Sequence, residues 1–333
     1  MFWALRGGGA GSWGVIIDAT LVTFPIFNAT VHTVNILTAT LDQTASLMTT
    51  HAKHVRDWDQ VRAGQYFILT GSTNGNLALS TIFKDLDGDA SKAQMASFLA
   101  DATKVGAVVQ GETTFTTFAN DIVGSPDDLS GINGILSSRL VPEYVYSDTL
   151  ERVGATYKQL LSQGIPIIIG AHIAGGAFCF RDVLWSYPEL TTLVGQVAAN
   201  AHIDSAVIPA WRLAKALVSV LLDTVVSVKF DRFCQILTGQ SWEDSLSAAD
   251  IQALRRKFTA TVRPVLEELA GGECSGSYSN EGDVLEPNFQ VTFFGANYAR
   301  LEKIKAAYDP HDLFIVPVGV RSEFWDSEGM CTV

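Results

Sequence analysis

Four glycines near the amino terminus are the first residues that could shape a binding site. Gly7, Gly8, Gly9 and Gly11 lie close together, just before an apolar stretch. Glycine has no Cβ atom and adopts positive φ without strain, so such a loop can approach a flat ligand or a phosphate closely. The alternative is a tight turn packed beneath another element.

Amide and phenol side chains near the carboxyl terminus could supply polar contacts and proton transfer. Asn280 and Asn297 can each donate and accept hydrogen bonds. Asn297 stands at the expected start of a helix, where an N-cap is the alternative role. Tyr278 carries a phenol with an ordinary pKa of about 10, so it needs neighbours that lower this pKa before it can act as a base. A buried tyrosine with one hydrogen bond is the alternative.

Other titratable residues indicate structure more than chemistry. His51 and His54 are spaced i, i+3 on an expected helix, but no third ligand accompanies them, so we predict no metal site. His172 lies in an apolar stretch and is expected to be a hydrogen-bonded core residue. Residues 85–89 resemble the start of a calcium loop without its glutamate, which favours a solvated turn.

Composition and charge exclude several classes of protein. The 333 residues are 47% hydrophobic and 17% charged, which is typical of a folded chain with a sizeable core. A net charge of -12 argues against nucleic acid as a partner. The longest apolar stretch, residues 206–230, is interrupted by charged residues, so we predict no membrane partner. The four cysteines lack CxxC spacing, and both disulfides and free thiols stay open.

The elements that must position these residues mix strands and helices without βαβ alternation. Residues 71–75 favour a hairpin turn between two of the strands. We therefore predict an α+β fold with an antiparallel sheet. The expected strands are 15–24, 30–37, 65–70, 76–83, 165–173, 206–209 and 213–228, and the expected helices are 41–55, 91–105, 147–161, 247–269 and 297–307. The periodicity of residues 213–228 is mixed, so a helix is the alternative there.

Several segments of the chain are dense in distinctive motifs. Residues 2–15 read FWALRGGGAGSWGV, residues 278–283 read YSNEGD and residues 293–301 read FFGANYARL. These segments resemble the berberine-bridge-enzyme-like, FAD-linked oxidoreductases, a family of PCMH-type flavoproteins, in their fungal form. Two shorter segments, 138–142 and 209–212, also match the family pattern in the right order.

The resemblance implies a division of the chain into three parts. Residues 27–270 would form an antiparallel-sheet substrate domain flanked by helices. Residues 1–26 would be a remnant of an incomplete PCMH-type FAD-binding domain, and residues 271–333 a C-terminal segment that returns to it. The histidine and cysteine to which the family attaches FAD would precede this sequence, so a missing N-terminal flavin-binding segment is a candidate partner.

The resemblance also implies a function and its residues. The expected function is FAD-dependent oxidation of a small organic substrate, in secondary metabolism and in a truncated form, with molecular oxygen as the candidate acceptor. Tyr278, and second Glu281, would take the substrate proton. The expected cofactor-binding residues are Gly7, Gly8, Gly9, Gly11, Asn280, Asn297 and Tyr298.

Two other functions stay open, namely a cofactor-free isomerase or cyclase and a non-catalytic binding protein that kept the substrate domain. Family members are often secreted, but the sequence shows no signal peptide, so the location is not predicted. We expect the glycine loop to fold against the asparagine-bearing tail as one wall of a cofactor site. We also expect exposed apolar surface at Phe2, Trp3, Trp13 and Phe293–Phe294.

Overall fold

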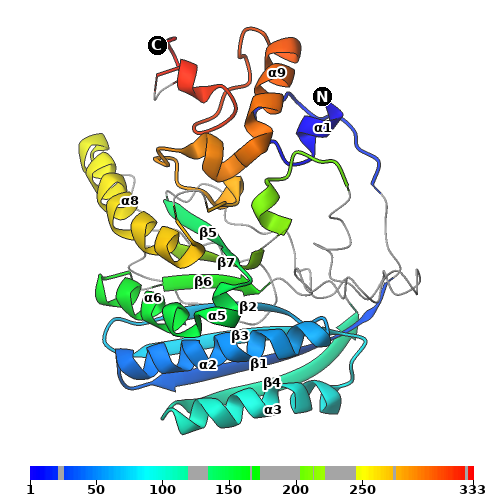
Figure 1. Cartoon of the computed structure of the whole chain (residues 1–333), viewed down its shortest axis with the longest axis vertical. Coiled ribbons are helices and arrows are strands. Elements are labelled where there is room, and N and C mark those ends of the chain that lie inside the picture. Colours follow the sequence, from blue (N-terminus) through cyan, green and yellow to red (C-terminus); the bar gives the residue numbers. More distant parts are fainter. Residues whose placement is uncertain are drawn as a thin grey trace.

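The computed structural model describes residues 1–21, 26–118, 134–165, 167–172, 203–212, 214–221, 245–272, 275–326 and 329–333. Within these residues a seven-stranded, wholly antiparallel sheet has the order β4-β1-β3-β2-β6-β7-β5 (Figure 1). The predicted α+β class is confirmed. The strands are β1 Asn28–Thr38, β2 Gly64–Thr70, β3 Gly75–Lys84, β4 Val108–Phe118, β5 Leu136–Pro142, β6 Ile167–His172 and β7 Ala214–Leu221.

Helices cover one face of this sheet and bury the main core against it. Large side chains such as Trp58, Phe67, Phe98 and Tyr157 are fully buried or nearly so at this interface. The covering helices are α2 Leu41–Gln60, α3 Gly88–Lys104, α5 Val145–Asp148, α6 Leu150–Ser162 and α8 Ala248–Ala270. We call this body the helix-covered sheet.

Local capping explains where the long helices begin. Thr40 accepts a hydrogen bond from the Gln43 backbone N–H, and the Gln43 side chain accepts one from Ala39, so α2 starts with a reciprocal capping box. Ser247 caps α8 by accepting from the Asp250 backbone N–H, as its position in the sequence predicts.

The two ends of the chain pack together at the other end of the molecule (Figure 1). Residues 1–14, 203–212 and 275–324 form this second body, which we call the terminal unit. Its small core joins Trp13 to Phe293, Phe294 and Leu301. It contains α1 Phe2–Leu5, the 3-10 turns η2 Pro209–Arg212, η3 Ser279–Glu281, η5 Gly295–Asn297 and η6 Ser322–Phe324, the π-helical turn η4 Gln290–Phe294, and α9 Tyr298–Tyr308.

A buried lysine fastens the terminal unit across the whole length of the chain. Lys305 is fully buried, and its ammonium group donates to the backbone carbonyls of Ser12 at 2.7 Å and Phe314 at 2.6 Å and to the Asp309 carboxylate. The expected fold-back of the glycine loop onto the carboxyl-terminal segment is therefore present.

Two of the predicted strands are wrong where the structure describes them. Residues 15–21 form neither a helix nor a strand, and Val15, Ile16 and Ile17 are largely exposed. Apolar, β-branched composition alone does not make a strand, because a strand also needs a hydrogen-bonding neighbour. Residues 206–209 form a turn that leads into η2 rather than a strand. Residues 222–228, the end of another expected strand, lie outside the described residues.

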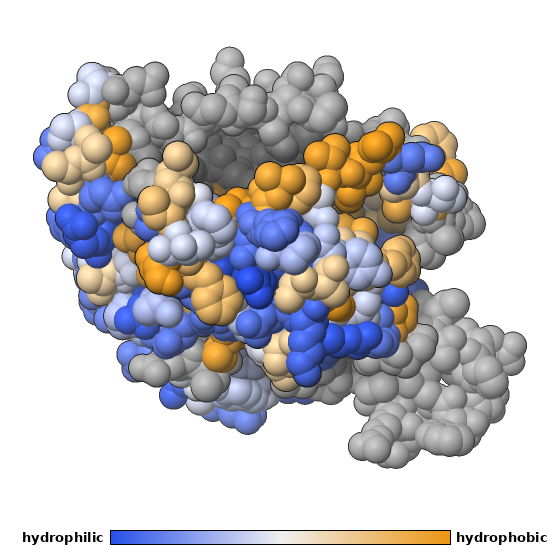
Figure 2. Space-filling view, turned by 90° about the horizontal axis from the view of Figure 1, so that it is seen from above, coloured by the Kyte–Doolittle hydropathy of each residue, from blue (hydrophilic) through white to orange (hydrophobic). Residues whose placement is uncertain are grey.

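Only some of the apolar residues that were expected at the surface are exposed. Phe2 is 74% exposed, as predicted, but Trp13, Phe293 and Phe294 are buried because they pack on one another in the terminal unit. Seen from above, apolar side chains gather on the surface among polar ones (Figure 2). Among the described residues, no helix combines the length and the apolar character that crossing a membrane requires.

Candidate functional site

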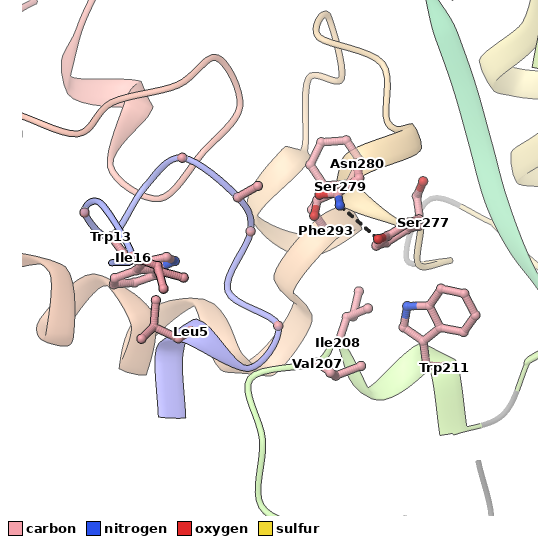
Figure 3. A pocket seen from close by; sticks show the side chains of 16 residues that line it. Leu5, Trp13, Ile16, Val207, Ile208, Trp211, Ser277, Ser279, Asn280 and Phe293 are labelled. Atoms are coloured by element: carbon pink, nitrogen blue, oxygen red, sulfur yellow. Dashed lines mark hydrogen bonds between the residues drawn. The ribbon is translucent and has the colours of Figure 1, made fainter. Parts of the chain in front are cut away.

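A cavity of about 430 Å³ lies where three distant segments of the chain meet. The segments are the glycine loop after α1, the stretch from Val207 to Trp211, and the stretch that begins at Ser277 (Figure 3). A volume of this size is within the range of small-molecule and cofactor sites. The cavity is therefore the candidate functional site.

The glycine loop forms one side of the cavity through its backbone. Gly7, Gly9 and Gly11 line it with φ values of +121°, +87° and +76°, which side chains of L-residues rarely tolerate. A Cβ atom on Gly7 would lie 2.3 Å from the Val207 backbone nitrogen, so this loop can approach Val207 only as glycine. Gly8 does not line the cavity. Its Cβ position lies 2.5 Å from the Ala4 carbonyl oxygen, so here the packed-turn interpretation applies.

A phenol and an amide form the polar side of the cavity. The Asn280 side-chain N–H donates to the Tyr278 hydroxyl oxygen at 2.9 Å, the hydrogen bond that is dashed in Figure 3. The Trp211 ring meets the Tyr278 ring edge to face, with centroids 5.8 Å apart. Both Tyr278 and Asn280 line the cavity. These contacts fix the direction of the phenol oxygen.

The structure places Glu281 away from the cavity lining. This residue ends η3, directly after Asn280, and it is not among the residues that line the cavity. Partial burial, and then the charge of Glu281, raise the pKa of Tyr66 on β2.

Asn297 and Tyr298 also lie outside the cavity lining, where they hold neighbouring segments in place. The Asn297 amide donates to the carbonyls of Ala206 at 3.2 Å and Val207 at 3.0 Å, and its side chain makes no capping bond to α9. Its contact with the site is thus made through Val207. The Tyr298 hydroxyl donates to the Glu323 carboxylate at 2.6 Å. Burial and this carboxylate raise the pKa of Tyr298.

Several cavity residues carried no assigned role in the sequence analysis. Val207, Ile208 and Trp211 belong to or adjoin a segment that matches the family pattern, and this was the available signal. Ser277 gave no signal. It reaches the site because its hydroxyl bonds to Ser138 on β5 at 2.7 Å.

His51 and His54 on α2 and His172 on β6 are buried and lie outside the cavity lining. His172 bonds to the buried Asp59 carboxylate at 3.0 Å, which agrees with the predicted core role. His51 bonds to Gln65 at 3.1 Å and packs among aromatic rings. No cluster of three potential metal ligands occurs in the part of the chain that the structure describes.

The lining of the cavity suits a planar ring with polar edges. On one side, backbone without Cβ atoms allows close approach to a flat face, and Trp13 and Ile16 add apolar surface. On the other side, Asn280 and Ser279 offer polar groups to the edge of such a ring. The residues present therefore fit a flavin ring.

Comparisons with known proteins also find similarity to flavin-linked enzymes. Residues 277–321 match the family model described as berberine and berberine like. An uncharacterized FAD-linked oxidoreductase of Arthroderma benhamiae is 30% identical, over 99% of this chain and 53% of the relative. The FAD-linked oxidoreductase easE of Claviceps purpurea is 27% identical, over 99% of this chain and 62% of the relative. This chain thus spans only about half to three fifths of the length of these relatives.

Solved structures share the fold. The VAO-type flavoprotein MtVAO615 from Myceliophthora thermophila aligns with a TM-score of 0.74 at 20% identity, over 100% of this chain and 55% of that chain. Berberine bridge enzyme from Eschscholzia californica aligns with a TM-score of 0.61 at 13% identity, over 96% of this chain and 60% of that chain. The family model, the relatives and the shared fold together support a resemblance of this chain to the berberine-bridge-enzyme-like flavoproteins.

Proposed function

We propose that this chain forms the substrate-facing part of an FAD-linked oxidoreductase and one wall of the site for its flavin ring. The observation that carries this proposal is the cavity at which the glycine loop meets Tyr278 and Asn280. The relatives that align with nearly all of this chain are named FAD-linked oxidoreductases, which favours redox chemistry over a cofactor-free isomerase, cyclase or binding protein.

The residues of the cavity would divide the work of holding the cofactor. The backbone at Gly7, Gly9 and Gly11 would lie against the ring, and Asn280 would meet its polar edge. When bound, FAD supplies the acceptor for a hydride from the substrate, and we propose molecular oxygen as the acceptor that reoxidises it. Gly8, Asn297 and Tyr298 would hold the segments that line the site in place without contacting the cofactor.

Tyr278 is the proposed base for the substrate proton. In its deprotonated form the phenol oxygen could accept a proton, and the Asn280 N–H donates to that same oxygen. Trp211 holds the ring from its other side. Glu281, the next residue after Asn280, stays the second candidate, although its place outside the cavity lining favours Tyr278.

We also propose the division into a substrate domain and flavin-side segments. Residues 27–270 would receive the substrate, and residues 1–26 and 271–333 would face the cofactor. The stretch 203–212 adds to this division, because it belongs to the middle of the sequence but lines the cavity with the two ends.

Titration of FAD with the purified chain, followed by quenching of flavin fluorescence, tests this function. We expect saturable quenching, and we expect Gly7→Ala to weaken it about tenfold or more because the new Cβ collides with the Val207 backbone. Gly164→Ala is the matched control, because Gly164 also has positive φ, at +82°, but lies outside the cavity lining and has open space at its Cβ position. Equal affinity in both variants would contradict the assigned site.

A further inference from the structure

A buried network of charges joins β5 and α8 to the segment that carries Tyr278. The Arg139 side chain on β5 is 1% exposed, and it donates to Glu267 of α8 at 2.9 Å and to Glu286 at 2.7 Å. Arg263 adds a second ion pair to Glu267 at 3.0 Å. Two arginines thus face two carboxylates, and the buried Asp283 carboxylate lies within electrostatic reach of Glu286 and Arg139.

The network continues from Glu286 to the cavity. The Glu286 carboxylate accepts a hydrogen bond from the Thr292 hydroxyl at 3.2 Å. The Thr292 carbonyl accepts one from the Ser277 backbone N–H at 2.8 Å. Ser277, which lines the cavity and directly precedes Tyr278, bonds through its hydroxyl to Ser138, the neighbour of Arg139 on β5. The hydrogen bonds therefore form a closed ring that returns to β5.

Alternation along β5 places the network on both faces of the sheet. Arg139 reaches α8 on the helix-covered face, whereas Ser138 and Leu140 face the cavity segments. The Leu140 backbone N–H also donates to the Gly276 carbonyl at 2.8 Å. Residues 276 and 277 are thus fixed to a strand of the rigid sheet immediately before Tyr278.

Stability alone does not account for such an arrangement. Burying charges carries a desolvation cost, and well-packed apolar residues can replace buried ion pairs without loss of stability. Charge-assisted hydrogen bonds, by contrast, fix direction as well as distance. We therefore expect Arg139 and Glu286 to fix the geometry of the segment that carries Tyr278 more than to add stability.

We propose that Arg139 and Glu286 are positioning residues, which act through Thr292 and Ser277 to fix Tyr278 at the cavity. This inference rests on the proposed function for its meaning in catalysis. Glu267 supplies an internal comparison, since it pairs with the same guanidinium group but leads only into α8.

Hydrogen exchange of two matched variants, Glu286→Gln and Glu267→Gln, tests the proposal in the whole chain. Each replaces a buried carboxylate of Arg139 by an amide of the same size. We expect Glu286→Gln to speed amide exchange at Ser277 and Leu140 about tenfold or more, and Glu267→Gln to change it less than about threefold. Equal effects of the two variants, or none, would overturn the proposal.

Thr292→Val and Thr292→Ser keep the test decisive if Glu286→Gln does not fold. Valine has nearly the shape of threonine but cannot donate to Glu286, whereas serine keeps the hydroxyl. Faster exchange at Ser277 in Thr292→Val, with exchange restored in Thr292→Ser, supports the network. Identical exchange in the valine and serine variants contradicts it.

FAD titration of the same variants separates failure of the inference from failure of the function. If the unmodified chain binds FAD, we expect Glu286→Gln to weaken its affinity about tenfold and Glu267→Gln to leave it within about threefold. Absence of FAD binding by the unmodified chain would contradict the proposed function, while the exchange experiment would still decide the role of the network.

Discussion

The helix-covered sheet and the terminal unit are stabilised in different ways. The sheet buries a continuous apolar core that includes Trp58, Phe67 and Phe98. The terminal unit has a far smaller core and depends on single polar residues that reach across the chain, above all Lys305. The sheet is therefore held together by many apolar contacts, whereas the terminal unit, which lines the site, depends on a few specific polar contacts.

A strongly exposed apolar segment follows directly after the amino-terminal part of the terminal unit. After the glycine loop, Val15, Ile16 and Ile17 are 80%, 67% and 95% exposed and pair with no described strand. Exposed apolar groups of this kind are typical of contact surfaces. Further contacts are thus expected at this segment, and the sheet offers a second such surface at Tyr66, Phe115 and Phe118, which are about half exposed.

The largest effect is expected from a cavity in the sheet core. Phe98→Ala should lower the free energy of unfolding by about 3–5 kcal/mol, because it removes a fully buried ring. Phe294→Ala, its counterpart in the terminal unit, should act mainly on exchange of the amides in residues 1–14 and 289–301. Denaturant unfolding and hydrogen exchange measure the two effects, and equal global destabilisation would break the distinction between the regions.

A slightly smaller effect is expected when the buried lysine loses its charge. Lys305→Met should cost about 2–4 kcal/mol within the terminal unit, because the carbonyls of Ser12 and Phe314 lose their donor and Asp309 loses its counter-charge. Limited proteolysis should then cut the glycine loop. Lys303→Met, on the same helix, is the control. An intact loop in Lys305→Met would contradict the role assigned to this residue.

Lowering the pH should destabilise the helix-covered sheet, because His51 is buried in its core. Burial, and then the neighbouring His172, lower the pKa of His51 to about 3. Its unfolded pKa is about 6.5, so between these values only the unfolded chain binds the proton, and stability falls as the pH falls below about 6.5. At pH 5 the loss from this group is about 2 kcal/mol.

Unfolding between pH 7 and pH 5 measures this loss. His51→Gln should flatten the dependence of stability on pH, and His311→Gln, at an exposed position, should leave it unchanged. An unaltered slope in His51→Gln would show that His51 is not the group responsible.

The smallest effect on stability is expected at the exposed apolar segment. Ile17→Ser should change the free energy of unfolding by less than about 0.5 kcal/mol, since the side chain is 95% exposed. It should nevertheless reduce self-association at high concentration, as measured by light scattering. If the unmodified chain is monomeric at high concentration, the prediction that this segment promotes self-association is wrong.

The sequence predicted the elements whose signals are local. Helix α2 followed from its apolar spacing, and the β2–β3 hairpin from the turn residues 71–75. The strand expected at 15–24 was wrong over its described residues, because pairing depends on a partner that composition does not reveal. Helix α6 begins at Leu150 instead of near Ser147, because the short helix α5 occupies the preceding residues.

The site was predicted only as far as its motifs extend. Gly7, Gly9, Gly11, Tyr278 and Asn280 came from segments that resemble the family, and they line one cavity. Long-range contacts that no local pattern encodes bring in the remaining residues. Ser277 depends on Ser138, which lies 139 positions earlier in the chain.

The most direct test of the central claim is a hydrogen-exchange footprint of FAD on the unmodified chain. FAD should slow exchange in two peptides far apart in sequence, residues 7–14 and 277–281, while the amides of α2 and α3 keep their rates. Protection confined to the helix-covered sheet, or no protection at saturating FAD, would contradict this claim.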